Sequence, residues 1–202
     1  MRITIAVMML ILGLCTSMTA RAEPQKLAAG EGLQGRFEQV RHLTGFEQPI
    51  RSTGVFYLLP GIELIWQTET PFRTRTILDD FGVRQDVKGR QVTQIELSRF
   101  PGLKVLRDAL EDSLSGNWQQ LEALSGHKLQ KNGDKWLLQM APQPGGPSLP
   151  FQQVNFQIGR YLETVEIVKE GGDKDVITFF DQKQAPIAQI RQSADDNGGP
   201  AQ

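Results

Sequence analysis

Few residues of this chain could take part in acid–base, nucleophilic or metal chemistry. The two histidines, His42 and His127, lie far apart in polar surroundings, so we expect surface residues and no pair with metal-ligand spacing. Asp79 and Asp80 could be imagined as a carboxylate pair, but adjacent strand residues point to opposite faces, and the following Phe81-Gly82 favours a turn. The sequence contains neither a nucleophile elbow nor a phosphate-binding glycine loop. We therefore expect no enzyme, metal or cofactor; a hydrolase with an unrecognised carboxylate pair is the alternative.

Two arginines have a spacing that indicates a shared surface. Arg73 and Arg75 lie two residues apart in a predicted strand, so we expect their side chains on one face of a sheet. Such a face is commonly solvated in an antiparallel sheet. The alternative is a docking patch, or a contact with the anionic head group of a ligand.

One segment has the spacing of an amphipathic helix. Four leucines at intervals of three, four and four residues fall on one helix face. Pro101 suits the first turn and Gly116 the end. The leucines are Leu103, Leu106, Leu110 and Leu114, and the opposite face carries Lys104, Arg107, Asp108, Glu111 and Asp112.

Most of the remaining chain predicts short antiparallel strands with turns between them. The strands have about five to eight residues, and Asn132-Gly133 is a strong hairpin signal. A short helix is expected before Arg36, and residues 191–202 are expected to form a flexible tail because they are polar and rich in turn residues. The predicted strands are 55–59, 62–68, 72–78, 83–87, 91–97, 127–131, 135–140, 153–158, 161–168 and 176–180.

These elements predict an α+β fold built on a single curved antiparallel sheet. A sheet of this many strands tends to curl, and if it stays unclosed it leaves a concave apolar surface that amphipathic helices can cover as a lid. The space between sheet and lid is a candidate lipid-binding cavity. Each apolar residue there could equally be plain core. The candidate lining residues are Phe37, Phe56, Leu58, Trp66, Ile77, Leu103, Leu106, Leu110 and Leu114.

The N-terminal segment predicts export. Arg2 precedes an apolar stretch, residues 3–14, and Ala20-Arg21-Ala22 ends the segment with small residues, as in a secretory signal peptide cleaved before Glu23. Leu14 is a poor residue to precede a lipidated cysteine, so Cys15 is expected to be lost with the signal peptide. We expect residues 23–190 to form one domain in the periplasm of a Gram-negative type of envelope, without disulfides.

The charge balance argues against binding of nucleic acid. Without Arg2 and Arg21 the 22 basic residues fall to 20, against 23 acidic residues. A negatively charged protein of this kind has no electrostatic attraction for phosphate backbones.

Several short motifs together resemble the LolA-type periplasmic carriers of lipoproteins. Leu33 to Val40 is similar to the family's opening segment, and Gly54-Val55-Phe56 to its second strand. Pro60, Trp66 and Pro71 follow in the order of the family's core signature. Leu78 to Gly82, Asp134 to Leu138 and Phe151 to Glu166 are similar to later turns and strands. The resemblance covers nearly all of residues 23–190.

The resemblance implies an unclosed β-barrel whose helical lid covers a hydrophobic cavity. It also implies a carrier that shields the acyl chains of lipoproteins, receives them from an inner-membrane donor complex and delivers them to an outer-membrane acceptor. We expect the carrier to be a monomer. Leu59 stands where the family commonly has an arginine that holds the lid closed. The alternatives are a carrier of another lipid or apolar product, and an interaction module of the envelope that binds no ligand.

Overall fold

The computed structural model describes residues 23–87 and 90–198. The predicted signal peptide, with Cys15, lies outside the described residues. No helix within the described ranges is both long and apolar enough to cross a bilayer.

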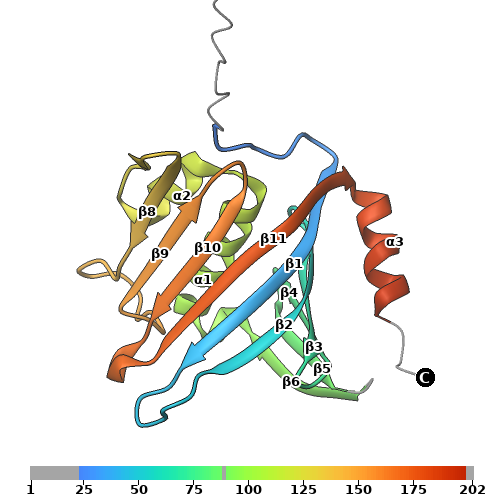
Figure 1. Cartoon of the computed structure of the whole chain (residues 1–202), viewed down its shortest axis with the longest axis horizontal. Helices are drawn as coiled ribbons and strands as arrows, with labels where there is room; N and C mark the ends of the chain where they lie inside the picture. The colour runs from blue at the N-terminus through green and yellow to red at the C-terminus, as the bar shows by residue number, and fades with distance from the viewer. Residues whose placement is uncertain (1–22, 88–89, 199–202) are drawn as a thin grey trace, which may run out of the picture.

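Eleven strands form one antiparallel sheet in the order β6-β5-β4-β3-β2-β1-β11-β10-β9-β8-β7 (Figure 1). The sheet curls, and β6 and β7 are its two edges, so the expected α+β fold with an unclosed barrel is confirmed. The strands are β1 (Glu31–His42), β2 (Ile50–Leu59), β3 (Glu63–Thr70), β4 (Thr74–Asp79), β5 (Gly82–Val87), β6 (Arg90–Glu96), β7 (Gln130–Asn132), β8 (Lys135–Met140), β9 (Gln153–Ile158), β10 (Leu162–Val168) and β11 (Lys174–Pro186).

Within the described part of the chain, three α-helices cover the two faces of this sheet unequally. The helices α1 (Pro101–Ser115) and α2 (Trp118–Ser125) pack on the concave inner face, which is the far side of strands β8 to β11 in Figure 1. The helix α3 (Ile187–Asn197) packs on the outer face of the curled half of the sheet. The 3₁₀ turns η1 (Leu97–Arg99) and η2 (Glu170–Gly172) complete the structure.

The predicted central helix is confirmed with nearly the expected bounds. α1 begins at Pro101 and is ended by Gly116, whose φ of 74° is the left-handed conformation that favours glycine. A Cβ at Gly116 would also lie 2.2 Å from the carbonyl oxygen of Gln25, so the segment before β1 packs directly against this turn. α2, which was not predicted, follows after two intervening residues, Gly116 and Asn117.

The short helix expected before Arg36 is wrong, because this region forms β1. β1 lies at the centre of the sheet between β2 and β11, and Leu33 and Phe37 on it are completely buried. Gly35 sits at an irregularity in the pairing with β11. Pairing on both sides and burial of the apolar residues outweigh the local propensity of the sequence.

The flexible tail expected for residues 191–202 is wrong for residues 191–197, which belong to α3. Ile190 and Ala194 are completely buried against Tyr57, Leu59 and Ile65. The amide of Asn197 donates a 2.9 Å hydrogen bond to the hydroxyl of Tyr57. The two apolar residues were too few to reveal the helix in an otherwise polar sequence.

Candidate functional site

An apolar layer fills the space between the inner face of the sheet and α1. Its centre is an aromatic cluster on four central strands: Phe37, Phe56, Trp66 and Phe179. The ring centroids of Phe37 and Trp66 are 4.0 Å apart, and Phe56 meets Phe179 edge to face at 5.4 Å. Since Phe37 and Phe56 are completely buried, the layer is closed to solvent at this point.

Glycine at position 54 makes room for this cluster. Gly54 pairs with Phe37 across β1 and β2. A Cβ there would lie 2.9 Å from the ring of Phe37 and 2.0 Å from the carbonyl oxygen of Gln67, and only a backbone shift could relieve the second contact. The aromatic layer therefore depends on the absence of a side chain at Gly54.

We expect Gly54→Ala to lower the free energy of unfolding by about 1–3 kcal/mol, the usual cost of overpacking a core. Thermal unfolding followed by circular dichroism measures the change. Gly133→Ala is the control, because Gly133 has no heavy atom within 4 Å of its added Cβ and only its positive φ opposes the substitution. A Gly54→Ala midpoint equal to that of the parent would contradict this account of the cluster.

The leucines of α1 line the other side of the apolar layer. Leu114 is buried, and Leu106 and Leu110 are partly buried and pack against the same cluster as the inner strands. Among the predicted sheet residues, Phe56, Leu58 and Trp66 lie on this face with Phe37. The structure thus brings together seven of the nine predicted residues around one layer; whether they bind lipid stays a prediction.

Ile77 is wrongly placed by the prediction. It pairs with Ile65, which pairs with Tyr57, and this row faces α3 on the outer side of the sheet. The residues next to Ile77 on β4 point to the inner face, and one of them, Leu78, packs against the inner layer. A change of one residue in the phase of a strand moves its side chains to the other face.

Leu103 lies apart from the layer and lines an open groove of about 550 Å³. The groove runs between the start of α1 and the loop that joins β8 to β9, and its lining is mainly apolar. Phe100 at its edge is 54% exposed. The other lining residues are Ile95, Arg99, Pro101, Gly102, Pro147, Ser148, Leu149 and Pro150. This groove was not predicted, and the proline-rich segment 142–150 is its only local signal in the sequence.

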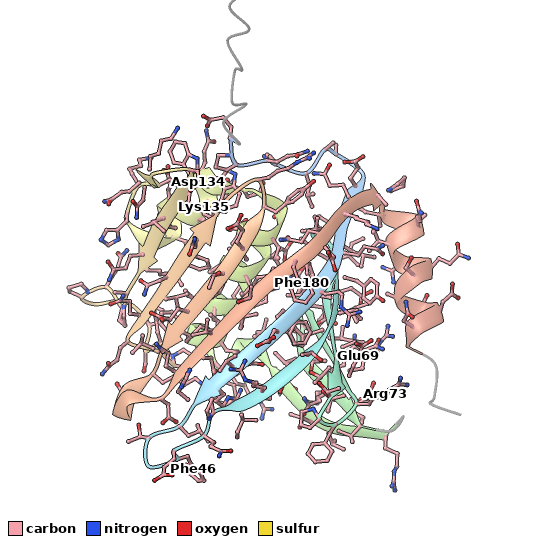
Figure 2. All side chains as sticks on the ribbon, viewed as in Figure 1. Phe46, Glu69, Arg73, Asp134, Lys135 and Phe180 are labelled. Carbon is pink, nitrogen blue, oxygen red and sulfur yellow. The ribbon has the colours of Figure 1, made fainter. Side chains whose placement is uncertain are left out.

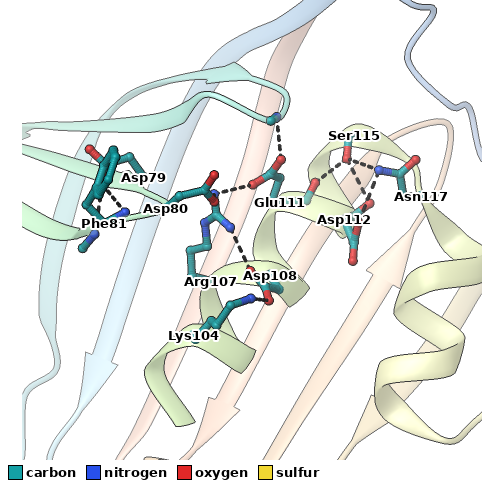
Figure 3. Close-up of polar contacts among 12 residues, drawn as sticks. Asp79, Asp80, Phe81, Lys104, Arg107, Asp108, Glu111, Asp112, Ser115 and Asn117 are labelled. Carbon is teal, nitrogen blue, oxygen red and sulfur yellow. Dashed lines mark hydrogen bonds and ion pairs between the residues drawn. The ribbon is translucent and has the colours of Figure 1, made fainter. Parts of the chain in front are cut away.

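Polar contacts hold the middle of α1 to the rim of the sheet, which is formed here by the β2–β3 and β4–β5 turns (Figure 3). The guanidinium of Arg107 lies 2.8 Å from the carboxylate of Asp80 in the β4–β5 turn and 3.2 Å from that of Glu111. Glu111 also accepts a 2.7 Å hydrogen bond from the backbone N–H of Gly61 in the β2–β3 turn. α1 is therefore fastened to two neighbouring turns of the sheet by two of its own side chains.

Arg107 is nearly buried, although it was predicted on the solvated face of the helix. Its side chain is only 9% exposed. Burial alone would lower the pKa of Arg107, but its hydrogen bond to Asp108 and the charges of Glu111 and Asp80 raise the pKa above its ordinary value. The guanidinium therefore stays charged, and the helix carries a paired cation under the rim.

The predicted turn at Asp79 and the predicted pair of arginines have different outcomes. Asp79 accepts 2.9 Å hydrogen bonds from the N–H groups of Phe81 and Gly82, which confirms the turn. Arg73 directly precedes β4, which begins at Thr74, so the shared face of Arg73 and Arg75 stays a prediction. Arg75 donates a 2.8 Å hydrogen bond to the carbonyl oxygen of Ala194 and thereby holds the end of α3.

Asp112, in the last turns of α1, has a strongly perturbed pKa. Burial raises the pKa to about 6, against the opposing hydrogen bond from Asn117, and the charges of Glu111 and Asp108 add to the rise. Because the folded pKa lies above the unfolded value, the folded protein binds more protons between the two values. The contribution of Asp112 to stability is therefore fully present at low pH and declines as the pH rises toward about 6.

Asp112→Asn should remove this decline. We expect the variant to be more stable than the parent by about 1 kcal/mol at pH 7.5 and by less at pH 4.5, because the amide keeps an acceptor for Asn117 without a charge. Thermal melts of parent and variant at the two pH values measure the double difference. Asp196→Asn, on the exposed face of α3, is the control, and an equal response of both variants would contradict the prediction.

Comparison with known proteins gives only distant likenesses. No family model matches the chain, and no curated protein matches its sequence. Among solved structures, the chain is similar to the LolA superfamily protein NE2245 from Nitrosomonas europaea, with 8% identity and a TM-score of 0.38 over 77% of this chain and 87% of that chain. It is also similar to LprF from Mycobacterium bovis, with 10% identity and a TM-score of 0.32 over 73% of this chain and 85% of that chain.

Proposed function

We propose that this protein is a non-enzymatic carrier that shields acyl chains between α1 and the inner face of its half-barrel. One observation supports this most strongly. α1 presents leucines to a curved apolar layer, yet its described polar contacts with the sheet are concentrated at the rim, through Arg107 and Glu111. A helix held in this way can move away from the sheet as a unit when a ligand replaces its apolar contacts.

The closed arrangement and the groove support a defined entry route. In this arrangement the side chains of the protein itself fill the centre of the layer. The groove of about 550 Å³ lies beside the start of α1 and has the size of an ordinary small-molecule site. An acyl chain would bind there first, beside Leu103 and Phe100, and then advance along the leucine face of α1 as the helix lifts.

The energetics favour such a carrier. Each methylene group kept from water contributes about 0.8 kcal/mol, so one chain of about sixteen carbons gains roughly 12 kcal/mol when it is fully shielded. The lost contacts between α1 and the sheet offset part of this gain. Exchange of one set of apolar contacts for another permits both uptake and release.

The finer proposal is that the cargo is a lipoprotein that moves from the inner to the outer membrane through the periplasm, between a donor complex and an acceptor. Leu59, where the LolA-type proteins commonly have an arginine, is buried against α3 on the outer face. Leu59 therefore takes no part in the contacts between α1 and the rim, which come from Arg107 and Glu111. A different lipid as cargo remains the alternative.

Mass spectrometry of organic extracts tests the proposal directly. The protein is purified after secretion from its full-length sequence in a Gram-negative host, and a mock preparation from the same compartment is the control. Acylated molecules in stoichiometric amount are the expected result, and their head groups distinguish lipoprotein from free lipid. Lipid-free protein that also fails to bind a fluorescent fatty acid would overturn the proposal and favour an interaction module without a ligand.

A further inference from the structure

Residues 23–28, here called the N-terminal strap, cross one end of the sheet before the chain enters β1 (Figure 1). The backbone N–H of Gln25 donates a 2.7 Å hydrogen bond to the carbonyl oxygen of Arg160 in the β9–β10 turn. The side-chain oxygen of Gln25 accepts a 2.6 Å hydrogen bond from the guanidinium of Arg160, and its side-chain amide donates one of 3.2 Å to Gln184 on β11. Gln25 is therefore fixed to the sheet by its backbone and by both polar groups of its side chain.

The turn that holds Gln25 is itself held in place. Lys135, at the start of β8, donates a 2.6 Å hydrogen bond to the carboxylate of Glu163 on β10. Since β9 lies between β8 and β10, this ion pair spans the end of β9, where the turn with Arg160 begins. Figure 2 shows Asp134 and Lys135 at this end of the molecule. The strap is therefore anchored to the sheet itself and not to a free loop.

The strap also contacts the last turn of α1. The N–H of Leu27 donates a 2.9 Å hydrogen bond to the carbonyl oxygen of Ser115, the last residue of α1, and a carbonyl at this position has no partner within the helix. Leu27 is buried in the inner apolar layer. A Cβ at Gly116 would lie 2.6 Å from the Cα of Lys26, so the backbones of the strap and the helix end are in direct contact.

The link between α1 and α2 holds the same end of α1. Gly116 and Asn117 alone join the two helices, and Leu121 of α2 is completely buried in the inner layer. The N–H of Asn117 donates a 2.8 Å hydrogen bond to the carbonyl oxygen of Asp112, one turn back in α1. The last turn of α1 is thus held from two sides, by the strap and by α2.

The first turn of α1 is attached in a different way. A Cβ at Gly102 would lie 2.0 Å from the carbonyl oxygen of Ser148, so this turn packs closely against the β8–β9 loop. No hydrogen bond between described residues joins the two segments. The open groove, with Leu103 in its lining, lies at this end of the helix. The last turn of α1 is therefore bonded to the sheet through the strap, whereas the first turn packs against a loop without hydrogen bonds.

We infer that α1 opens by rotation about Gly116 and Asn117, with the N-terminal strap as the fixed side of this hinge and Gln25 as the residue that positions the strap. The rim contacts of α1 break in this movement, and the first turn swings away from the β8–β9 loop and widens the groove, while Leu114 stays near the sheet. Hinges commonly lie at the ends of elements, where a few residues absorb the rotation. The hinge rests on the movement of α1 in the proposed function, and it defines which end moves and what holds the other.

Thiol labelling tests the hinge in the ligand-free protein. Ala109→Cys and Ser113→Cys each place one thiol at a completely buried position of α1, four residues apart, so that a maleimide reacts when the helix opens. Each variant also carries Cys15→Ser, since Cys15 is the one cysteine of the chain. Rates are normalised to those of the unfolded variants. Because Ser113 lies closer to the hinge, its replacement should react several-fold more slowly than that of Ala109.

Gln25→Ala removes both side-chain hydrogen bonds of the strap and should raise the labelling rate of Ser113→Cys roughly tenfold, and that of Ala109→Cys by less. Gln67→Ala is the matched control, because Gln67 donates a 2.8 Å hydrogen bond to the carbonyl oxygen of Asn197 at the end of α3 and should leave both rates unchanged. Equal rates for the two thiols without Gln25→Ala, or equal rises with Gln25→Ala and Gln67→Ala, would overturn the hinge.

A fluorescent fatty acid is titrated in parallel with the parent protein. Absence of binding would overturn the carrier function, whereas the labelling rates, which need no ligand, decide the hinge separately.

Discussion

Substitution of both Leu106 and Leu110 by aspartate is expected to lower the affinity for a fluorescent fatty acid by at least about tenfold. A tenfold change corresponds to about 1.4 kcal/mol, and the burial of a single leucine side chain contributes about 1.5–3 kcal/mol. Both leucines pack against the inner apolar layer. Two carboxylates there would face the acyl chain directly, so the loss should be large. Fluorescence titration of the purified protein measures it.

The control for this experiment is Leu137→Asp, a change of the same chemistry on β8 at an exposed leucine. Its affinity should equal that of the parent. Because the aspartates could also disturb folding, Leu106→Ala/Leu110→Ala provides a second test, with an apolar surface of smaller area and an expected loss of about threefold. A folded aspartate variant that binds as tightly as the parent would remove α1 from the site.

Arg107→Met is expected to cause a large loss of stability. The substitution leaves Asp80, Asp108 and Glu111 close together under the rim without their shared cation. Removal of one partner from a buried ion pair costs about 3–5 kcal/mol, and partial exposure of the acidic partners places this case near 3 kcal/mol. The melting temperature should fall by about 6–12 °C in a chain of this size.

The same variant should also take up the probe faster. Without Arg107 the middle of α1 is held to the rim by Glu111 alone, so less free energy is needed to lift the helix. Stopped-flow mixing with the fluorescent fatty acid measures the association rate. Arg191→Met is the matched control, since the side chain of Arg191 is 44% exposed, against 9% for Arg107, and its 2.9 Å pair with Glu63 should contribute at most about 1 kcal/mol. Equal effects of the two substitutions would show that the rim contacts are ordinary surface pairs.

Asp112 affects the same helix in a different way. At neutral pH its charge opposes burial of the last turns of α1, whereas Arg107 stabilises the middle of the helix. The closed form of α1 is therefore a balance between one unfavourable buried charge and one favourable ion-pair network. Asp112→Asn and Arg107→Met are expected to change the opening of α1 in opposite directions.

The sequence alone determined the local periodicities of this protein. The leucines between Pro101 and Gly116 recur at intervals that place them on one helix face. This pattern specifies α1 whatever the helix packs against, because 3.6 residues per turn is a property of the helix itself. Alternating residues such as Val154, Phe156 and Ile158 specify a half-buried strand in the same way. The turn at Asp79 was equally accessible, since its carboxylate bonds to the backbone only two and three residues away.

Only the tertiary structure decided which partners these elements meet. The face of Ile77 depends on its pairing with Ile65, and no local pattern records the register of a strand. Arg107 belongs to the charged side of α1 in sequence, but the β4–β5 turn closes over it. α3 and the groove arise from contacts between segments more than 40 residues apart. Burial and ion pairing are set by these distant neighbours, which is why the sequence predicted the helix and the sheet but neither how α1 is held nor where a ligand could enter.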